Sequence, residues 1–395
     1  MKVLILGGSG IQGSASASDL LRMQPAAEVV LAGRTVSSLE STAARLNSDR
    51  VRVREGDVTD IDSLAELIRS EGCQIVISSV PWTVSIEPLE AAIEAGAHFI
   101  DYGLYQNRDF DDRISEFDQK AKRAQVTVIP SCGVAPGLTN MLAAYGASKL
   151  DRVDTVHIYV GGIPENPQPP LQYKVVWSLE GVWTQFFEEC RVIRGGALTG
   201  VEAGSGREEL EFPETGRLEA ASTDGLGTLL HMYNDPIMKG AREVFEKTIR
   251  HPGHYDKIMT LKACGLLDTD PVEVDGVRVS PRKMLTTLLT PRLQLEKDER
   301  DMTVMRVRVA GSIRGEDATW VFDMVDYRDM KTGILSMGRT TGYTGSILAP
   351  MVHRGRISTP GVVEPEKLGA DPELMEEILR EYSKRDINIA QRANG

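Results

Sequence analysis

A glycine-rich turn near the start of the chain constrains the fold more than any other feature of the sequence. A short apolar run at 3–6 is followed by Gly8, Gly10 and Gly13, in the spacing G-x-G-x-x-G. The first glycine of such a turn permits a tight bend after a buried strand, the second lets the backbone approach a pyrophosphate, and the third lets the next helix pack on the sheet. The spacing therefore predicts a dinucleotide site that consists of Gly8, Ser9, Gly10, Ile11, Gln12 and Gly13.

A glycine-rich turn without a ligand is the alternative. After a helix expected at 11–23, an apolar run at 28–32 predicts a second strand, and strands and helices continue to alternate up to about residue 150. This alternation is typical of an α/β Rossmann fold, a doubly wound parallel sheet that binds ligands at the carboxyl ends of its strands. We therefore expect further cofactor contacts where the predicted strands end, at Gly33, Arg34, Thr35, Asp57, Val58, Ser79, Val80, Pro81, Tyr102, Gly133 and Val134. Asp57 is equally suited to cap a helix.

The end of the second predicted strand indicates which dinucleotide binds. An acidic residue that binds the ribose 2′-hydroxyl is expected about 20 residues after the glycines, but Gly33-Arg34-Thr35 stands there. Gly33 leaves room and Arg34 brings a fixed positive charge, which suits a 2′-phosphate. NADP is therefore favoured over NAD, although an arginine that stacks on the adenine would be compatible with either cofactor.

The length of the chain predicts more than one domain, because 395 residues exceed what a single core usually supports. We expect a Rossmann domain over 1–150 and an inserted α+β domain over 151–339 that binds substrate and mediates dimerisation. A C-terminal segment, 340–395, is expected to return to the Rossmann domain. Within the inserted domain the alternating pattern predicts antiparallel strands at 302–314, 318–327 and 333–339.

Charge and composition exclude several classes of partner. The net charge of −12 argues against binding to nucleic acid or to an anionic membrane surface, and no apolar run approaches the roughly 18 residues of a membrane span. The cysteines are scattered without the spacing of zinc ligands, so we expect no metal site. The same scatter predicts a reducing, cytoplasmic location. The cysteines are Cys73, Cys132, Cys190 and Cys264.

Ordered blocks along nearly the whole chain resemble the saccharopine dehydrogenase family. The matching blocks are 8–13, Gly133-Val134-Ala135-Pro136-Gly137, 159–164, 170–181 and 247–254. The resemblance implies nicotinamide-dependent oxidation or reduction at a carbon–nitrogen bond of a lysine-derived amino acid. It also implies a Rossmann domain with an inserted α+β domain, and a homodimer.

Two kinds of family member compete. The 161–164 block, the Ala135-Pro136-Gly137 form and the length are most similar to lysine 6-dehydrogenase, whereas Tyr173-Lys174 and Arg34 are more similar to the glutamate-forming saccharopine reductases. Those reductases carry an aspartate where this chain has Ala135, which favours free lysine or a similar diamino acid, oxidised to the 6-semialdehyde. Saccharopine is the alternative substrate. An NADP(H)-binding redox sensor without turnover is the alternative of another class, and it would need neither Arg250 nor Lys174.

The expected chemistry needs a cation for a substrate carboxylate and a group that accepts a proton from the amine. Arg250 is the best carboxylate clamp, because a guanidinium offers two parallel donors. Lys174 is a second clamp or the general base, and Asp101 and Tyr102 are candidates for orienting the substrate amine or the nicotinamide. Each residue has a structural alternative. Arg250 could form a surface ion pair, and Lys174 could be a solvated lysine. Asp101 could cap a strand end, and Tyr102 could pack against the next loop. His231, His251 and His254 are weaker candidates.

The first testable expectation concerns cofactor choice. The wild-type protein should bind NADP(H) more tightly than NAD(H), and Arg34→Asp should abolish this preference, because losing a charge-assisted contact to the 2′-phosphate costs about 1.5–3 kcal/mol. Fluorescence titration of both proteins with both cofactors gives the ratio of dissociation constants. Equal affinities of the wild-type protein for the two cofactors would contradict the expectation.

Overall fold

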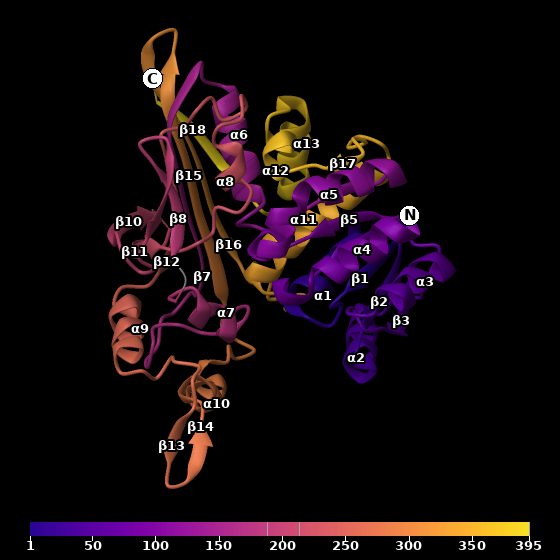
Figure 1. Cartoon of the computed structure of the whole chain (residues 1–395), viewed down its shortest axis with the longest axis horizontal. Helices are drawn as coiled ribbons and strands as arrows, with labels where there is room; N and C mark the ends of the chain where they lie inside the picture. Colours follow the sequence, from indigo (N-terminus) through magenta and orange to yellow (C-terminus); the bar gives the residue numbers. More distant parts are fainter. Residues whose placement is uncertain (188, 213, 395) are drawn as a thin grey trace.

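The computed structural model describes residues 1–187, 189–212 and 214–394 and contains two separate large sheets (Figure 1). The first sheet is wholly parallel and has the strand order β17-β6-β5-β4-β1-β2-β3. Its strands are β1 (Lys2–Leu6), β2 (Glu28–Gly33), β3 (Val51–Glu55), β4 (Ile75–Ser78), β5 (His98–Asp101), β6 (Thr127–Ile129) and β17 (Gly361–Val362). The order of β1 to β6 is that of a doubly wound Rossmann sheet, which confirms the predicted fold class.

Helices cover both faces of the first sheet, because its strands are apolar on both sides. Val3 and Ile5 of β1 pack into one hydrophobic cluster and Leu4 and Leu6 into another, and all four are fully buried. The helices are α1 (Ile11–Met23), α2 (Val36–Leu46), α3 (Ile61–Glu71), α4 (Ile86–Ala95) and α5 (Arg108–Ala124), with 3₁₀ turns at Trp82–Val84 and Leu104–Gln106. Helix α6 (Leu138–Ser148), which follows β6, packs instead on strands of the second sheet. None of the helices in the described part of the chain has the length and apolarity needed to cross a membrane.

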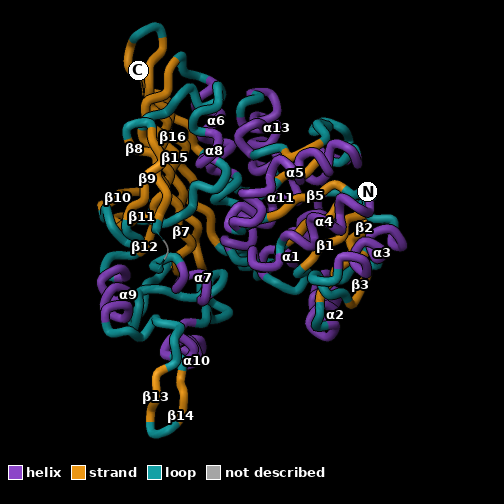
Figure 2. The backbone as a smooth tube through the Cα atoms, in the orientation of Figure 1, coloured by secondary structure: helices purple, strands orange, loops and turns teal. Residues whose placement is uncertain are grey.

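The second sheet is mixed and consists mainly of long strands, shown in orange at the left of Figure 2. Its order is β10-β11-β12-β7-β15-β16-β18, with β8 on β12 and β9 on β8, and only β12 and β7 run parallel. The strands are β7 (Arg152–Pro164), β8 (Cys190–Arg194), β9 (Ala197–Val201), β10 (Glu208–Phe212), β11 (Gly216–Ser222), β12 (Glu243–Arg250), β15 (Asp301–Ile313), β16 (Glu316–Tyr327) and β18 (Ala390–Asn394).

Short helices and a hairpin connect the strands of the second sheet and lie at its ends (Figure 1). They are α7 (Leu179–Thr184), α8 (Leu229–Met232), α9 (His254–Ala263), α10 (Pro281–Leu293) and the strand pair β13 (Val272–Val274) and β14 (Val277–Val279). The C-terminal part adds α11 (Ser336–His353), α12 (Pro365–Gly369) and α13 (Pro372–Ser383).

The C-terminal segment joins both sheets. Helix α11 packs along α1 at glycine contacts: a Cβ on Gly342 would lie 2.6 Å from the carbonyl oxygen of Gln12. Strand β17 then pairs with β6, whereas β18 crosses back and pairs with β16. The last strand therefore departs from the expectation that 340–395 returns to the first sheet alone.

The expectation of a strand at 333–339 is wrong, because α11 already begins at Ser336. The carboxylate of Asp301, at the start of β15, accepts hydrogen bonds from the backbone amides of Ser336 (3.0 Å) and Met337 (3.1 Å). These amides open the helix and have no partner inside it. The cap comes from a residue far away in sequence, so the local pattern could not indicate where the helix begins.

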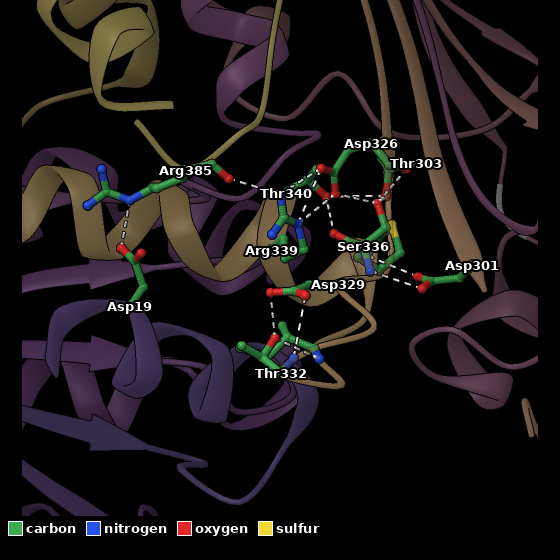
Figure 3. A network of polar contacts seen from close by, with 12 residues as sticks. Asp19, Asp301, Thr303, Asp326, Asp329, Thr332, Ser336, Arg339, Thr340 and Arg385 are labelled. Atoms are coloured by element: carbon green, nitrogen blue, oxygen red, sulfur yellow. Dashed lines mark hydrogen bonds and ion pairs between the residues drawn. The ribbon is translucent and has the colours of Figure 1, made fainter. Parts of the chain in front are cut away.

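A buried polar network holds the two sheets and the C-terminal segment together (Figure 3). Arg339 of α11 forms an ion pair with Asp326 of β16 at 3.0 Å and donates to the carbonyl oxygen of Arg385 at 3.0 Å. Arg385, which follows α13, pairs in turn with Asp19 of α1 at 2.8 Å, and both side chains are fully buried. The hydroxyl of Ser346 donates to the same Asp19 oxygen. Four segments thus share one chain of contacts.

Removing one partner from this network should be costly. Arg339→Met leaves the Asp326 carboxylate buried without its cation, and we expect a loss of about 3–5 kcal/mol in the free energy of unfolding. Adding Asp326→Asn should recover part of the loss, because it removes the uncompensated charge. Arg152→Met is the matched control: its pair with Asp154 is exposed, and such pairs contribute about 0–1 kcal/mol. Urea unfolding of the wild-type protein and of the three variants measures these differences in the free energy of unfolding. Equal losses for Arg339→Met and Arg152→Met would contradict the prediction.

Candidate active site

The glycine-rich loop after β1 has the geometry of an anion-binding turn. The left-handed residue is Gly7, with φ +70°, so the expectation that Gly8 makes the tight bend is wrong. A Cβ on Gly13 would lie 2.5 Å from the Gly7 carbonyl oxygen and 2.7 Å from Oγ of Ser79, which explains the third glycine. Ser9 and Gly10 are exposed, and α1 begins directly after them. Because the first amides of a helix have no partner inside it, this loop fits a pyrophosphate; Ile11 and Gln12, also expected at the cofactor, are half-buried at the start of α1.

Positive charge lies at the end of β2, where the adenosine end of a dinucleotide would bind. Arg34 and Thr35 are exposed, and Gly33 is half-buried beside them. Asp57 accepts hydrogen bonds from the amide and the hydroxyl of Thr59, which lower its pKa, and the charge of Arg34 lowers the pKa further. Asp57 is thus engaged in a turn and is exposed, and Val58 after it is half-buried. An exposed guanidinium without an acid in the ribose position fits a 2′-phosphate.

The loop after β4 closes against the glycine-rich turn. The hydroxyl of Ser79 donates to the carbonyl oxygen of Leu6 at 2.7 Å, which fixes the loop on the end of β1. Val80 is half-buried and Pro81 is exposed. The 133–137 loop lies deeper: Gly133 and Val134 are buried, and the Gly133 amide donates to the Pro136 carbonyl at 3.0 Å.

Asp101 and Tyr102, expected to orient substrate or cofactor, have structural roles instead. One Asp101 oxygen accepts hydrogen bonds from the amides of Gly103, Leu104 and Ser131, which ties the ends of β5 and β6 together. Burial raises the pKa of Asp101 to about 6. The Tyr102 hydroxyl lies 2.7 Å from the hydroxyl of Ser16 and donates to the Gly342 carbonyl at 3.0 Å, so the ring joins α1 to α11.

Arg250, the last residue of β12, is a buried cation that forms no ion pair with any acid among residues 1–187, 189–212 and 214–394. Its side chain donates to the Ile249 carbonyl at 2.8 Å and to Oε1 of Gln185 at 3.2 Å. In the described part of the chain no ion pair joins Arg250 to a carboxylate, and Nε has no hydrogen-bond partner. Leaving such a charge buried and unpaired is costly. A substrate carboxylate would remove this cost, so the guanidinium suits the clamp predicted from the sequence.

Lys174 differs from Arg250 because its charge is already compensated. Its Nζ lies 3.2 Å from Oε2 of Glu299 and donates to the Gln294 carbonyl at 3.1 Å. The neighbouring Tyr173 is buried, and its ring lies 5.2 Å from the Arg250 guanidinium. Both contacts of the Lys174 Nζ are made within the protein, so the amino group is already engaged and is not free to meet a substrate. The structure therefore does not favour the expected role of Lys174.

Glu246 is an acidic residue of this region that the sequence pattern did not single out. It lies on the same face of β12 as Thr248 and Arg250, and the Thr223 hydroxyl donates to Oε2 at 2.5 Å. None of the described lysines or arginines forms an ion pair with it, and burial raises its pKa to about 8. The signal that could have found it is the polar pattern at every second residue of the strand, because alternate side chains share one face.

Contacts at two places join this strand region to the Rossmann sheet. A Cβ on Gly162 of β7 would lie 2.5 Å from Cγ of Met337, and one on the next helix residue, Gly338, would lie 3.2 Å from Ile11 Cγ2. A Cβ on Gly227 would lie 2.7 Å from Cβ of Pro136. The end of β7 therefore contacts the first turn of α11, and the next residue of that helix contacts α1 directly after the glycine-rich loop.

The remaining candidates hold structural contacts. His231 lies 2.7 Å from Oδ1 of Asp111, and Nε2 of His251 lies 2.7 Å from the Pro164 carbonyl. Cys132 is fully buried, and burial raises the pKa of its thiol. Within the described ranges no group of three or more histidine, cysteine or acidic residues is placed to hold a metal ion.

Comparison with known proteins gives matches along the whole chain. The family model described as saccharopine dehydrogenase NADP binding domain matches residues 3–129, and the one described as saccharopine dehydrogenase C-terminal domain matches residues 133–387. The solved structure of the apo, histidine-tagged saccharopine dehydrogenase (L-Glu forming) from Saccharomyces cerevisiae is similar over 100% of both chains, with a TM-score of 0.80 and 21% identity. The fold is therefore shared.

Full-length curated relatives carry three different names. A carboxyaminopropylagmatine dehydrogenase of Synechocystis sp. is 22% identical, over 94% of each chain. A carboxynorspermidine synthase of Vibrio cholerae is 23% identical, over 94% of this chain and 93% of the relative. The NADP(+)-, L-glutamate-forming saccharopine dehydrogenase of Saccharomyces cerevisiae is 23% identical, over 96% of this chain and 97% of the relative.

The loop geometry predicts different effects for two glycine substitutions. Gly13→Ala should lower the melting temperature without any cofactor, because the new Cβ meets the Gly7 carbonyl and Ser79. Gly10→Ala should leave the fold intact, since its Cβ would meet only the Gly7 oxygen at 3.2 Å, but should weaken NADP(H) binding about tenfold or more by obstructing the phosphates. Thermal unfolding and cofactor titration of both variants separate the effects. Unchanged cofactor affinity in Gly10→Ala would place the pyrophosphate elsewhere.

Proposed function

Because the chain belongs to the saccharopine dehydrogenase family, we propose that it is an NADP(H)-dependent oxidoreductase that forms or cleaves a carbon–nitrogen bond of an amino-acid-derived amine. The observation that carries the proposal is Arg250, a buried guanidinium to which no carboxylate of the described residues is paired, so that a ligand carboxylate would suit it. A cofactor-binding sensor would have no need of such a residue in its second domain. Arg34, exposed at the end of β2, supports the choice of NADP over NAD.

The reaction class follows from what the relatives have in common. Saccharopine, carboxynorspermidine and carboxyaminopropylagmatine are all secondary amines that carry an α-amino-acid group. We propose the same class here: an α-amino acid with a terminal aldehyde joins an amine. When bound, NADPH supplies the hydride that reduces the C=N bond formed from aldehyde and amine with loss of one water, and NADP⁺ accepts it in the reverse direction.

Each half of the substrate has a residue of this chain to receive it. Arg250 holds the α-carboxylate of the amino-acid half through two parallel hydrogen bonds. Glu246 lies four residues away on the same face of an extended strand, roughly 13 Å between Cα atoms at about 3.3 Å per residue. A buried carboxyl without a cation suits a ligand with a positive charge. The two ends of the substrate thus differ in charge.

Glu246 distinguishes among the possible amines. A diamine or a guanidino amine brings a second positive charge that would stabilise the ionised form of Glu246, whereas glutamate, the amine half of saccharopine, brings two carboxylates and no such charge. We therefore propose a cationic amine as the partner. The lysine 6-dehydrogenase reaction expected from the sequence corresponds to ammonia as the amine, and it remains an outcome of the assay.

The experiment is an NADPH oxidation assay in which aspartate 4-semialdehyde or 2-aminoadipate 6-semialdehyde is paired with 1,3-diaminopropane, agmatine, glutamate or ammonia. Coupled products of 1,3-diaminopropane or agmatine, identified by mass spectrometry, would support the proposal. Saccharopine as the only product would reverse the choice of amine, and lysine as the only product would restore the sequence-based expectation. Cofactor binding without turnover of any pair would favour the sensor.

Arg250→Lys tests the clamp in the same assay. The substitution keeps the charge and loses the paired donors, so we expect KM for the aldehyde to rise about tenfold, with kcat little changed. KM for the amine should stay the same, since Glu246 receives that half. Arg152→Lys is the control, because it makes the same substitution at an exposed arginine that pairs with Asp154 and not at Arg250. An unchanged KM for the aldehyde would remove Arg250 from the site.

A further inference from the structure

Three buried polar groups with unused hydrogen-bonding capacity lie around the ring of Tyr173. Nε of Arg250 and Nε2 of His254 have no hydrogen-bond partner among the described residues, and the Tyr173 hydroxyl, whose oxygen faces the Trp177 side chain and the Val176 amide, has no acceptor for its proton there. The three side chains are at most 2% exposed. The Arg250 guanidinium lies 5.2 Å from the Tyr173 ring centre, and the rings of Tyr173 and His254 lie 5.4 Å apart. Buried polar atoms are ordinarily hydrogen-bonded, so such a cluster needs an explanation.

The donor and acceptor character of the three atoms is defined by their surroundings. Nδ1 of His254 lies 2.9 Å from the Leu171 carbonyl oxygen, which can only accept, so the ring proton is on Nδ1 and Nε2 keeps its lone pair. Burial, and next the charge of Arg250, lower the pKa of His254 to about 3, so the ring stays neutral. Arg250 and Tyr173 donate. The cluster therefore offers two donors and one acceptor close together.

We propose that Arg250, Tyr173 and His254 form a head-group site for an α-amino acid, in which His254 Nε2 accepts a hydrogen bond from the α-ammonium and the Tyr173 hydroxyl donates to the α-carboxylate. An α-amino acid carries its carboxylate and its ammonium on the same carbon, so their receptors must be neighbours, as these are. His254 opens α9 directly after the Gly253 turn (φ +83°), which returns the chain to Arg250. The proposal rests on the proposed function for the role of Arg250.

The head-group site selects ligands that carry an α-amino group as well as a carboxylate. A plain carboxylic acid would satisfy Arg250 and Tyr173 and leave Nε2 of His254 without a partner. Since a hydrogen bond that involves a charged group changes affinity by about tenfold or more, the protein should distinguish an α-amino acid from its deaminated analogue. This discrimination belongs to His254, whereas affinity for the carboxylate belongs to Arg250 and Tyr173.

The experiment compares L-norleucine with hexanoate, two ligands that differ only in the α-amino group, by calorimetric titration of the full chain in the presence of NADP⁺. The wild-type protein should bind norleucine about tenfold or more tightly than hexanoate. His254→Phe should bring the ratio close to one, and His254→Gln, whose amide oxygen can replace Nε2, should keep most of it. Tyr173→Phe should weaken both ligands alike. His251→Phe is the matched control, because this histidine also contacts a backbone carbonyl, and should leave the ratio unchanged.

Two outcomes would overturn the inference: equal binding of both ligands by the wild-type protein, or a preserved ratio in a folded His254→Phe variant. The titration does not depend on turnover, so it separates this inference from the proposed function. If the amino-acid aldehydes are turned over but 4-oxobutanoate, which lacks the amino group, reacts as fast as aspartate 4-semialdehyde, the reaction class stands and the head-group site fails. If nothing is turned over and norleucine still binds selectively, the head-group site stands and the proposed reaction fails.

Discussion

The buried contact between α1 and α11 is the interaction on which the rest of the structure depends. Glycines on α11 allow its backbone to approach α1, and the ion pairs of Asp19 with Arg385 and of Asp326 with Arg339 lock the contact in position (Figure 3). The first turn of α11 carries Met337, which fills the space beside Gly162 of the second sheet. The same helix thus touches the cofactor loop on one side and the substrate region on the other.

The charged groups of the α11 network and those of β12 differ in whether the protein itself supplies a partner. Buried ion pairs contribute little net stability when they are complete, but an incomplete pair is costly. In the network around α11 each arginine has an oppositely charged partner, whereas neither Arg250 nor Glu246 of β12 forms an ion pair within the described residues. A strand that carries an arginine and a carboxyl on one face is the basis for the proposal of a ligand with an anionic head and a cationic tail. The cost of the unpaired guanidinium in the free protein would favour binding of such a molecule.

The sequence allowed much of the fold to be predicted, because its signals are local. The spacing of Gly8, Gly10 and Gly13, the alternation of strands and helices up to about residue 150 and the Arg34 substitution depend on neighbours in the chain. Arg250 could be singled out for the same reason, since it lies in a block with family spacing. Even here the structure shifted one role: the left-handed bend is at Gly7, one residue earlier than the spacing suggested.

Only the tertiary structure decided which polar side chains contact each other from distant parts of the chain. Asp101 and Tyr102 looked available at a strand end, but amides and a hydroxyl from other elements occupy them. Lys174 has no acidic neighbour in the sequence, but Glu299 forms an ion pair with it in the folded chain. The start of α11 likewise depends on a distant residue, Asp301. Local sequence determines backbone conformation and which residues face inward, whereas the charge state and availability of a side chain depend on groups that folding brings within a few ångströms. For this protein the sequence by itself therefore determined the cofactor domain, and only the tertiary structure separated Arg250, Glu246 and His254 from the polar residues already in use.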